Sequence, residues 1–276
     1  MSVHFQKMSI DEYADLERKN GSRILQSGGI FWQEVRPFFF RPLYPLSAIP
    51  RGSAKPPWSS GLIGFQHMIP DPSAANSRMN FFVLDNLRGY SIRTLRHKYR
   101  ASLKKAHRHL VVKLIDDHEE LISAGHRIYT AFFKRTHYGW KGDRIDRASF
   151  EKWADIFYYH PKVLLFGTYH EKGLCSINIA YQVEDIVFFA TSFGDPEALR
   201  AKGPELALHW VREAARGCDS AKYIFMGSPS IRQGLDDFKI RRGCTLLSVP
   251  AYYRINPVAL FLVKMLSPSN YRKLVG

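Results

Sequence analysis

The hydrophobic pattern is clearest between residues 163 and 243. Three apolar, β-branched segments, at 163–169, 175–183 and 186–193, are separated by short polar breaks. Such segments with tight breaks predict an antiparallel three-strand meander. A helical pattern then continues to Arg216, and a fourth apolar segment begins at Lys222. A meander that leads into a crossover helix and another strand predicts an α/β fold, with a mixed, mainly antiparallel sheet and helices on both faces.

Elsewhere the pattern predicts further helices and a division of the chain into three parts. Apolar residues at three- and four-residue spacing favour helices, and the expected ranges are 10–19, 91–110, 117–133, 150–157 and 257–266. Residues 30–70 are rich in aromatic residues and proline, which favours strands and loops. We therefore expect an N-terminal aromatic and proline-rich lobe over 1–78, a core over 79–256 and a C-terminal amphipathic helix over 257–276.

Residues 91–110 carry the strongest concentration of positive charge. Nine Lys and Arg residues and no acid lie between Arg88 and Lys113. Beside its apolar stripe, the segment has a cationic stripe at four-residue spacing, made of Arg96, Arg100, Lys104 and Arg108. Like charges four residues apart destabilise a helix slightly. The stripe therefore predicts a polyanion-binding face, and a merely solvated basic face is the alternative.

The overall composition supports a folded, basic protein. Hydrophobic residues make up 45% and aromatic residues 14% of the 276 residues, which argues against disorder. The formal net charge of +15 favours polyanionic partners: tRNA, phosphorylated cofactors, nucleotide-linked lipids or an anionic membrane surface.

The cysteines and the two chain ends bear on location. Cys175, Cys218 and Cys244 are far apart and lack metal-ligand spacing, which predicts reduced thiols, a cytoplasmic setting and no metal site. The polar N-terminus lacks the apolar region of a signal peptide. The apolar segment 257–266 either packs on the protein or, helped by nearby Lys264, Arg272 and Lys273, contacts a membrane surface. We expect a cytoplasmic protein, peripheral to the inner face of the membrane in the second case.

Three pieces of the chain, in this order, carry a resemblance to a known family. Val83-Leu84-Asp85 precedes the basic segment, the meander leads to Arg200-x-x-Gly203, and the ending FMGSPSIRQGLDDFKIRRG contains Lys239 after an aromatic residue. Over roughly residues 80–255 this arrangement resembles the FemAB-like, or BioF-like, acetyltransferase domains of the GNAT superfamily. The resemblance implies an acyltransferase fold, with a degenerate second lobe of the same type at the N-terminus.

The resemblance also implies a donor site. Arg200 and Gly203 match the family's donor-loop signature, but Glu205 stands where that signature has a small residue. A carboxylate at the start of a helix opposes the binding of an anionic pyrophosphate. The interpretation is therefore that ordinary CoA binding is disfavoured and that a larger polyanionic donor is used.

Candidate site residues follow from the resemblance and from strand positions. Lys239, in the family's closing motif, is expected to approach the reacting carbonyl or a donor phosphate. Tyr181 is expected to orient an amine, with core packing as the alternative. The expected donor-binding residues are Phe193, Arg200, Gly203, Ser228, Arg232 and Arg242. The expected lip of an acceptor pocket is His137, Tyr138 and Trp140, with an ordinary loop as the alternative.

The predicted function is transfer of an acyl or aminoacyl group onto an amine acceptor. Zincin, nucleophile-elbow and P-loop motifs are absent from the sequence, which excludes those enzyme classes. The expected co-substrate is acyl-CoA, an acyl-carrier protein or aminoacyl-tRNA, without a tightly bound cofactor. The alternative is a non-catalytic basic protein that binds nucleic acid or an anionic membrane. An open, bulged strand near Phe193, with a pocket reaching Lys239, would favour the enzyme.

Overall fold

The protein forms two compact units that interleave along the chain. The computed structural model describes residues 3–136, 142–230, 233–268 and 271. The first unit consists of Met1–Ser9 and Phe82–Thr245, and the second of Ile10–Phe81 and Leu246–Gly276. The chain passes from one unit to the other at three points: between Ser9 and Ile10, within the strand β6 (Ser77–Leu84), and after the first residue of the strand β12 (Thr245–Ile255). The division expected at residues 78 and 256 stays a prediction.

The first unit contains the predicted antiparallel meander. Its strands are β8 (Val163–His170), β9 (Gly173–Val183) and β10 (Ile186–Gly194), and each pairs with the next in antiparallel fashion. Neighbouring strands extend the sheet on both sides. On one side, β7 (Val111–Leu114) pairs antiparallel with β8; on the other, β11 (Tyr223–Phe225) pairs parallel with β10, and the end of β6 pairs antiparallel with β11. The short strand β1 (Lys7–Met8) pairs parallel with the end of β9. The mixed, mainly antiparallel α/β sheet predicted from the sequence is confirmed.

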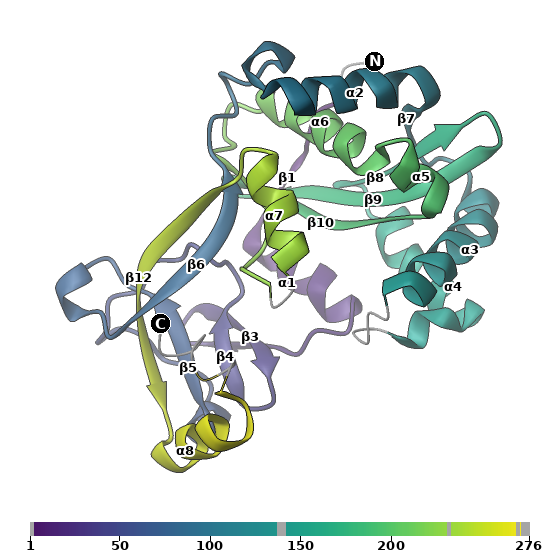
Figure 1. Cartoon of the computed structure of the whole chain (residues 1–276). Coiled ribbons are helices and arrows are strands. Elements are labelled where there is room, and N and C mark those ends of the chain that lie inside the picture. The colour runs from purple at the N-terminus through teal and green to yellow at the C-terminus, as the bar shows by residue number, and fades with distance from the viewer. Residues whose placement is uncertain (1–2, 137–141, 231–232, 269–270, 272–276) are drawn as a thin grey trace. The chain divides into compact units, whose positions relative to one another are not determined.

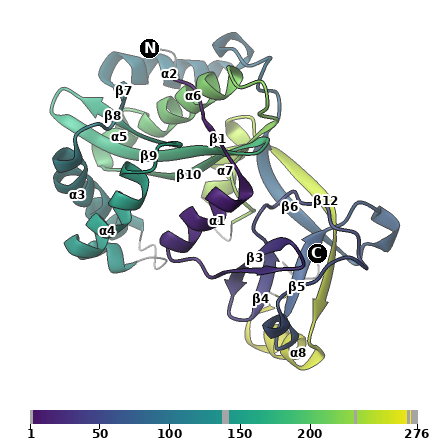
Figure 2. The same ribbon diagram turned by 180° about the vertical axis from the view of Figure 1, so that it is seen from behind.

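Helices cover both faces of this sheet (Figure 1). The helices of the first unit are α2 (His97–His109), α3 (His118–Thr136), α4 (Arg147–Tyr158), α5 (Pro196–Arg200), α6 (Gly203–Arg216) and α7 (Gln233–Arg241). Along one face lies α6, with α2 packed on it, while α3 and α4 lie along the other face (Figures 1 and 2). This sandwich explains why β9 is buried along nearly its whole length.

The two faces of the sheet have different cores. On the α6 face, small and branched side chains pack closely, among them Ala180, Val187, Leu208 and Val211. On the α3 and α4 face, the core is aromatic: the Phe193 ring lies 5.3 Å from that of Tyr129 and 5.8 Å from that of Trp153, measured between ring centroids. Burial of these large apolar surfaces is the main stabilising term of the unit.

The sequence predicts one continuous helix over 91–110, but the structure divides this basic segment in two. A short 3-10 turn, Ile92–Thr94, is followed by extended backbone at Leu95 and Arg96, and α2 begins at His97. The Ser91 hydroxyl accepts a hydrogen bond from the Arg93 amide, and such local bonds compete with helix formation. The apolar stripe is confirmed from Leu95 onward, while Ile92, expected inside, is 39% exposed.

The second unit contains a run of paired strands and, among its described residues, two α-helices. Strands β2 (Ile24–Ser27), β3 (Ile30–Arg36) and β4 (Phe39–Pro42) form an antiparallel run, β4 pairs parallel with β5 (Gly64–Met68), and β5 pairs antiparallel with β12. The helices are α1 (Ile10–Lys19) and α8 (Pro257–Leu266), both at the predicted places. Among the described helices, none has both the length and the apolar content that crossing a bilayer requires. A degenerate second lobe of the family fold stays a prediction for this unit.

A buried ion pair joins the first turn of α6 to the end of α7. The Arg242 guanidinium donates a hydrogen bond to the Glu205 carboxylate, and both side chains are only about one tenth exposed. Arg242 also donates to the Phe238 carbonyl at 2.9 Å and lies over the Phe238 ring. The packing of the first turn of α6 against the end of α7 therefore depends on Glu205 and Arg242 neutralising each other's charge.

We expect Glu205→Gln to destabilise the protein by about 3–5 kcal/mol, because it leaves the buried Arg242 charge without its counter-ion. Urea unfolding at neutral pH measures the change. The control is the double variant Glu205→Leu with Arg242→Leu, which removes both charges and should recover most of the loss. A change within about 0.5 kcal/mol for Glu205→Gln, the range of an ordinary surface substitution, would contradict a buried, mutually dependent pair.

Candidate functional site

The most distinctive backbone feature of the first unit is a bulge in β10. The register with β9 shifts between Phe189 and Thr191, so Ala190 is the extra residue. Pairing of β10 with β11 ends just before the bulge, at Phe188 opposite Phe225. Beyond Phe225 the chain follows β6 instead, since the Met226 amide donates to the Phe82 carbonyl at 2.8 Å. The two parallel strands therefore separate at the bulge, and a bulge leaves backbone groups outside the regular ladder.

A network of buried polar side chains lies beside this separation. The Ser192 hydroxyl donates to the Asn178 carbonyl oxygen at 2.8 Å, and the Asn178 amide nitrogen lies 3.1 Å from the Ser176 hydroxyl. Ser176 in turn shares a 2.6 Å hydrogen bond with Thr168. Cross-strand pairing places all four residues on the α6 face of the sheet. Ser192, which is exposed, carries this network to the surface on the far side of the bulge.

The expected donor loop lies at the same end of the sheet, but α5 covers it. Arg200, at the end of α5, is exposed, while Gly203, the first residue of α6, is buried. A Cβ atom at Gly203 would lie 3.1 Å from the Ala198 carbonyl and 3.3 Å from the Thr168 hydroxyl. The first residue of α6 therefore packs closely against α5 and β8.

The Glu205 carboxylate is in a different electrostatic setting from the one that the sequence predicts. The sequence predicts a carboxylate that repels an anionic donor at the start of α6. In the structure this carboxylate is buried and paired with Arg242. The charge of Glu205 is therefore neutralised by Arg242, so it does not oppose an anion as a free carboxylate would. Arg242, expected to bind donor, is engaged in this pair.

Lys239 lies on the β11 side of the separation between β10 and β11, against the segment that follows β11. Its ammonium donates to the Ser228 carbonyl at 3.1 Å and lies 5.0 Å from the centre of the Phe82 ring. The residue is only 6% exposed, which differs from the open cleft expected for it. Burial lowers the pKa of Lys239 from its usual value of 10.5, because desolvation penalises the charged form.

Three other predicted residues have simpler surroundings. Tyr181 is buried and stacks on Phe188, with ring centroids 5.6 Å apart. Phe193 belongs to the aromatic core under α3 and α4. Ser228 is exposed and contributes its backbone carbonyl to Lys239. The structure therefore brings Ser228 and Lys239 together, and it places Tyr181 and Phe193 in packing positions. Arg232, His137, Tyr138 and Trp140 lie outside the described residues.

The cationic stripe lies on the surface of α2. Arg96, Lys104 and Arg108 are exposed, and Arg100 is half-buried. A surface pocket of about 290 Å³ is lined by Ile92, Arg93, His97, Arg100, Ala101 and Lys104. Two stripe residues, with Arg93 beside them, therefore surround a hollow that has an apolar floor and no acid in its lining. Such a lining suits a phosphate group.

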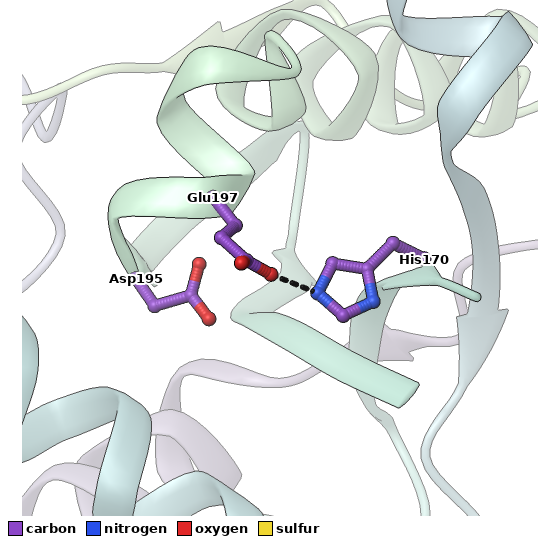
Figure 3. A group of neighbouring side chains, drawn as sticks. All are labelled: His170, Asp195 and Glu197. Atoms are coloured by element: carbon purple, nitrogen blue, oxygen red, sulfur yellow. Dashed lines mark ion pairs between the residues drawn. The ribbon is translucent and has the colours of Figure 1, made fainter. Parts of the chain in front are cut away.

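A second pocket, of about 350 Å³, is bordered by the cluster His170, Asp195 and Glu197 (Figure 3). Their potential ligand atoms all lie within 4.8 Å of one another, so these residues are spaced to hold a metal ion. Each carboxylate already has a partner: Glu197 pairs with His170 at 2.6 Å and with Lys172 at 4.0 Å, and Asp195 accepts from the Ala198 amide. Arg127 also lines the pocket, and its charge opposes a cation. We therefore assign the cluster to joining the β8–β9 turn to α5.

Sequence reasoning missed the polar network. Ser176 and Asn178 are, with Gln182, the polar residues of a mostly apolar central strand, and this interruption is the signal that could have identified them. Polar side chains are retained in a buried strand only where hydrogen-bond partners exist. Ala190, by contrast, leaves no trace in the sequence, because a bulge is a property of pairing.

Comparison with solved structures identifies the fold, while no family model and no curated protein matches the sequence. The C-terminal domain of a putative lysylphosphatidylglycerol synthetase from Agrobacterium fabrum is similar, with a TM-score of 0.58 and 12% identity over 95% of this chain and 92% of that one. L-PGS from Bacillus licheniformis is similar with a TM-score of 0.53 and 14% identity, over 91% and 90% of the two chains.

FemX is also similar, with a TM-score of 0.52 and 10% identity, over 67% of this chain; the match spans 63% of the FemX chain. Identities this low establish shared architecture and carry no residue roles. The observed features agree with that architecture: the antiparallel meander, the bulge where two parallel strands separate, and the crossover helix α6. The chain has the fold of the FemAB-like, GNAT-type acyltransferases.

Proposed function

We propose that the protein transfers an acyl or aminoacyl group from a polyanionic donor onto an amine, at the separation of β10 and β11. The observation that carries the proposal is the coincidence of two features there. The β10 bulge frees backbone groups on one side, and the buried Lys239 ammonium lies on the other side. Acyl transfer needs hydrogen-bond donors aimed at a developing oxyanion. A strand opening of this kind supplies them from the backbone.

The proposed reaction uses these groups in order. The neutral amine attacks the carbonyl carbon of the donor ester or thioester, and a tetrahedral oxyanion forms beside the bulge. Collapse of this intermediate forms the amide and breaks the bond to the leaving oxygen or sulfur. Lys239 donates a proton to that leaving group and regains one from the attacking nitrogen. Its lowered pKa suits it to this role, because a less basic amine makes a stronger acid.

The surface of α2 supports a polyanionic donor. Its stripe of Arg96, Arg100, Lys104 and Arg108 and the basic pocket beside Arg100 offer contacts to several phosphates at once. Among the donors considered, aminoacyl-tRNA uses such a surface most fully, whereas CoA and a carrier protein use less of it. No tightly bound cofactor is needed. An amine-bearing phospholipid or another envelope precursor is a close variant of the acceptor.

A purely non-catalytic binding protein is the less favoured alternative. It would use α2 in the same way, but it would have no need for a bulged strand that parts from its neighbour. Incubating the purified protein with charged tRNA and candidate amines, followed by mass spectrometry of the products, tests the proposal. Acyl transfer to an amine supports it, and tight tRNA binding without transfer to any amine would favour the alternative.

For Lys239→Ala we expect turnover to fall by about 10²–10³-fold, because the leaving group loses its proton donor and a positioned general acid contributes on this scale. Lys239→Met is the more conservative variant, because it keeps an unbranched side chain against Phe82 and removes only the charge. Both variants should show the fall while the KM of the donor holds. If Lys239→Met retains full turnover, the residue serves packing alone; if only the donor KM rises, it contacts donor phosphate.

For the four-residue variant Arg96→Gln, Arg100→Gln, Lys104→Gln and Arg108→Gln, we expect weaker tRNA binding. The slope of log affinity against log salt should flatten by up to about four units, because fewer counterions are released. The matched control is Lys98→Gln with Lys105→Gln, which lie on the same helix but outside the pocket. The control should change the slope much less. An unchanged slope in the four-residue variant would mean that the stripe is a solvated face.

We expect CoA and acetyl-CoA to bind weakly, because α5 fills the space at the N-terminus of α6 around Gly203. Isothermal titration calorimetry of the purified protein measures this directly. Low-micromolar affinity for CoA would contradict the expectation and favour a conventional acetyltransferase. Charged tRNA provides the comparison under the same buffer conditions.

A further inference from the structure

We propose that α8 binds the second unit to an anionic lipid bilayer by lying in the plane of the membrane interface. The inference is independent of the proposed transfer reaction, since it concerns a surface formed by the second unit alone. It rests on three observations: an exposed apolar face, a fixed attachment of the helix and the sign of the surrounding charge.

The outer face of α8 is apolar and open to solvent. Its side chains recur at positions i, i+3, i+4, i+7 and i+8 and are 49–82% exposed: Val258, Phe261, Leu262, Met265 and Leu266. The opposite face turns inward, with Ala259 buried and Leu260 and Val263 half-buried. A helix whose apolar side points to solvent marks an interaction site.

The start of α8 is fixed in its own unit. The Asn256 side-chain oxygen accepts a hydrogen bond from the Val258 backbone N–H at 3.0 Å. The backbone N–H of Asn256 donates to the Ile63 carbonyl at 2.8 Å. Next to Ile63, Leu62 is 53% exposed, and Trp58 one short helical turn earlier is 89% exposed. An exposed Trp is typical of the membrane–water interface. The segment that holds the start of α8 therefore also carries exposed apolar side chains.

The charge of this region identifies an anionic surface as the occupant. Residues 246–276 contain Arg254, Lys264, Arg272 and Lys273 and no acidic residue. Arg254 and Lys264 are exposed, the latter on α8 itself. Basic residues beside an apolar helix face attract anionic lipid headgroups. A second copy of the chain would bring the same positive charge to the contact, and a ten-residue helix offers little of the roughly 800 Å² per partner that a stable interface needs.

The length of α8 decides the mode of binding. Its ten residues are half the roughly 20 that a crossing helix needs. Its apolar face can therefore enter only the headgroup and upper acyl region, with the helix axis parallel to the surface. The second unit would rest on the membrane through α8 and Leu62.

The test is flotation of the full-length protein with phosphatidylcholine vesicles, with and without phosphatidylglycerol. The protein should float with the anionic vesicles and much less with the neutral ones. Phe261→Ser with Leu262→Ser and Met265→Ser should lower partitioning at least about tenfold, because the inserted apolar area is lost. Arg254→Gln with Lys264→Gln should lower it about tenfold on anionic vesicles only. The matched control is Val111→Ser with Leu114→Ser, two exposed apolar residues of β7 that should not matter.

Circular dichroism and transfer to a water-soluble amine show whether the α8 variants keep their fold and activity. Unchanged partitioning in the α8 serine variant overturns the proposal, and so does equal binding to neutral and anionic vesicles. Light scattering that shows a wild-type dimer and a monomeric α8 variant also overturns it, in favour of a second copy. Loss of transfer activity in Lys239→Met with normal flotation leaves the proposal standing, so the two proposals fail separately.

Discussion

The structure of the site depends on how β10 is paired. On one side, β10 pairs with β9 along its whole length, and on the other it pairs with β11 only as far as Phe188. The bulge at Ala190 coincides with the end of that second pairing. Because β9 is buried on both faces, its pairing with β10 is fixed. The end of the β10–β11 pairing at Phe188 is therefore a property of the fold.

Buried polar groups near the site show how the fold meets the cost of placing charge inside. Glu205 and Arg242 neutralise each other between α6 and α7. Tyr90 meets His209 at 2.7 Å, and burial lowers the pKa of this histidine to about 4, so that it is neutral at physiological pH. Lys239 differs, because its described contacts are a carbonyl and an aromatic ring. Burial lowers the pKa of Lys239, while the nearby Asp236 carboxylate acts in the opposite direction.

Much of the architecture could be predicted from the sequence, and the reasons are local. The meander, α4 and α8 follow from hydrophobic periodicity, which depends on residues near one another in the chain. The break at Leu95 was missed because the side chains of Ser91 and Thr94 compete with the helix. Burial of Lys239 and pairing of Glu205 could not be predicted, since both depend on contacts across 11 and 37 residues of sequence. The roles of Tyr181 and Phe193 were also uncertain because position in a strand does not specify which face is occupied by ligand.

The interleaving of the two units has a consequence for folding during synthesis. Strand β5 has β4 and β12 as its neighbours, and β12 is made some 180 residues later than β5. Until β12 emerges, one edge of β5 is unpaired, and exposed strand edges recruit other chains. All residues of the first unit, up to Thr245, are synthesised before that edge closes. The first unit can therefore fold early during synthesis, while the open edge of β5 needs protection until the last segment is complete.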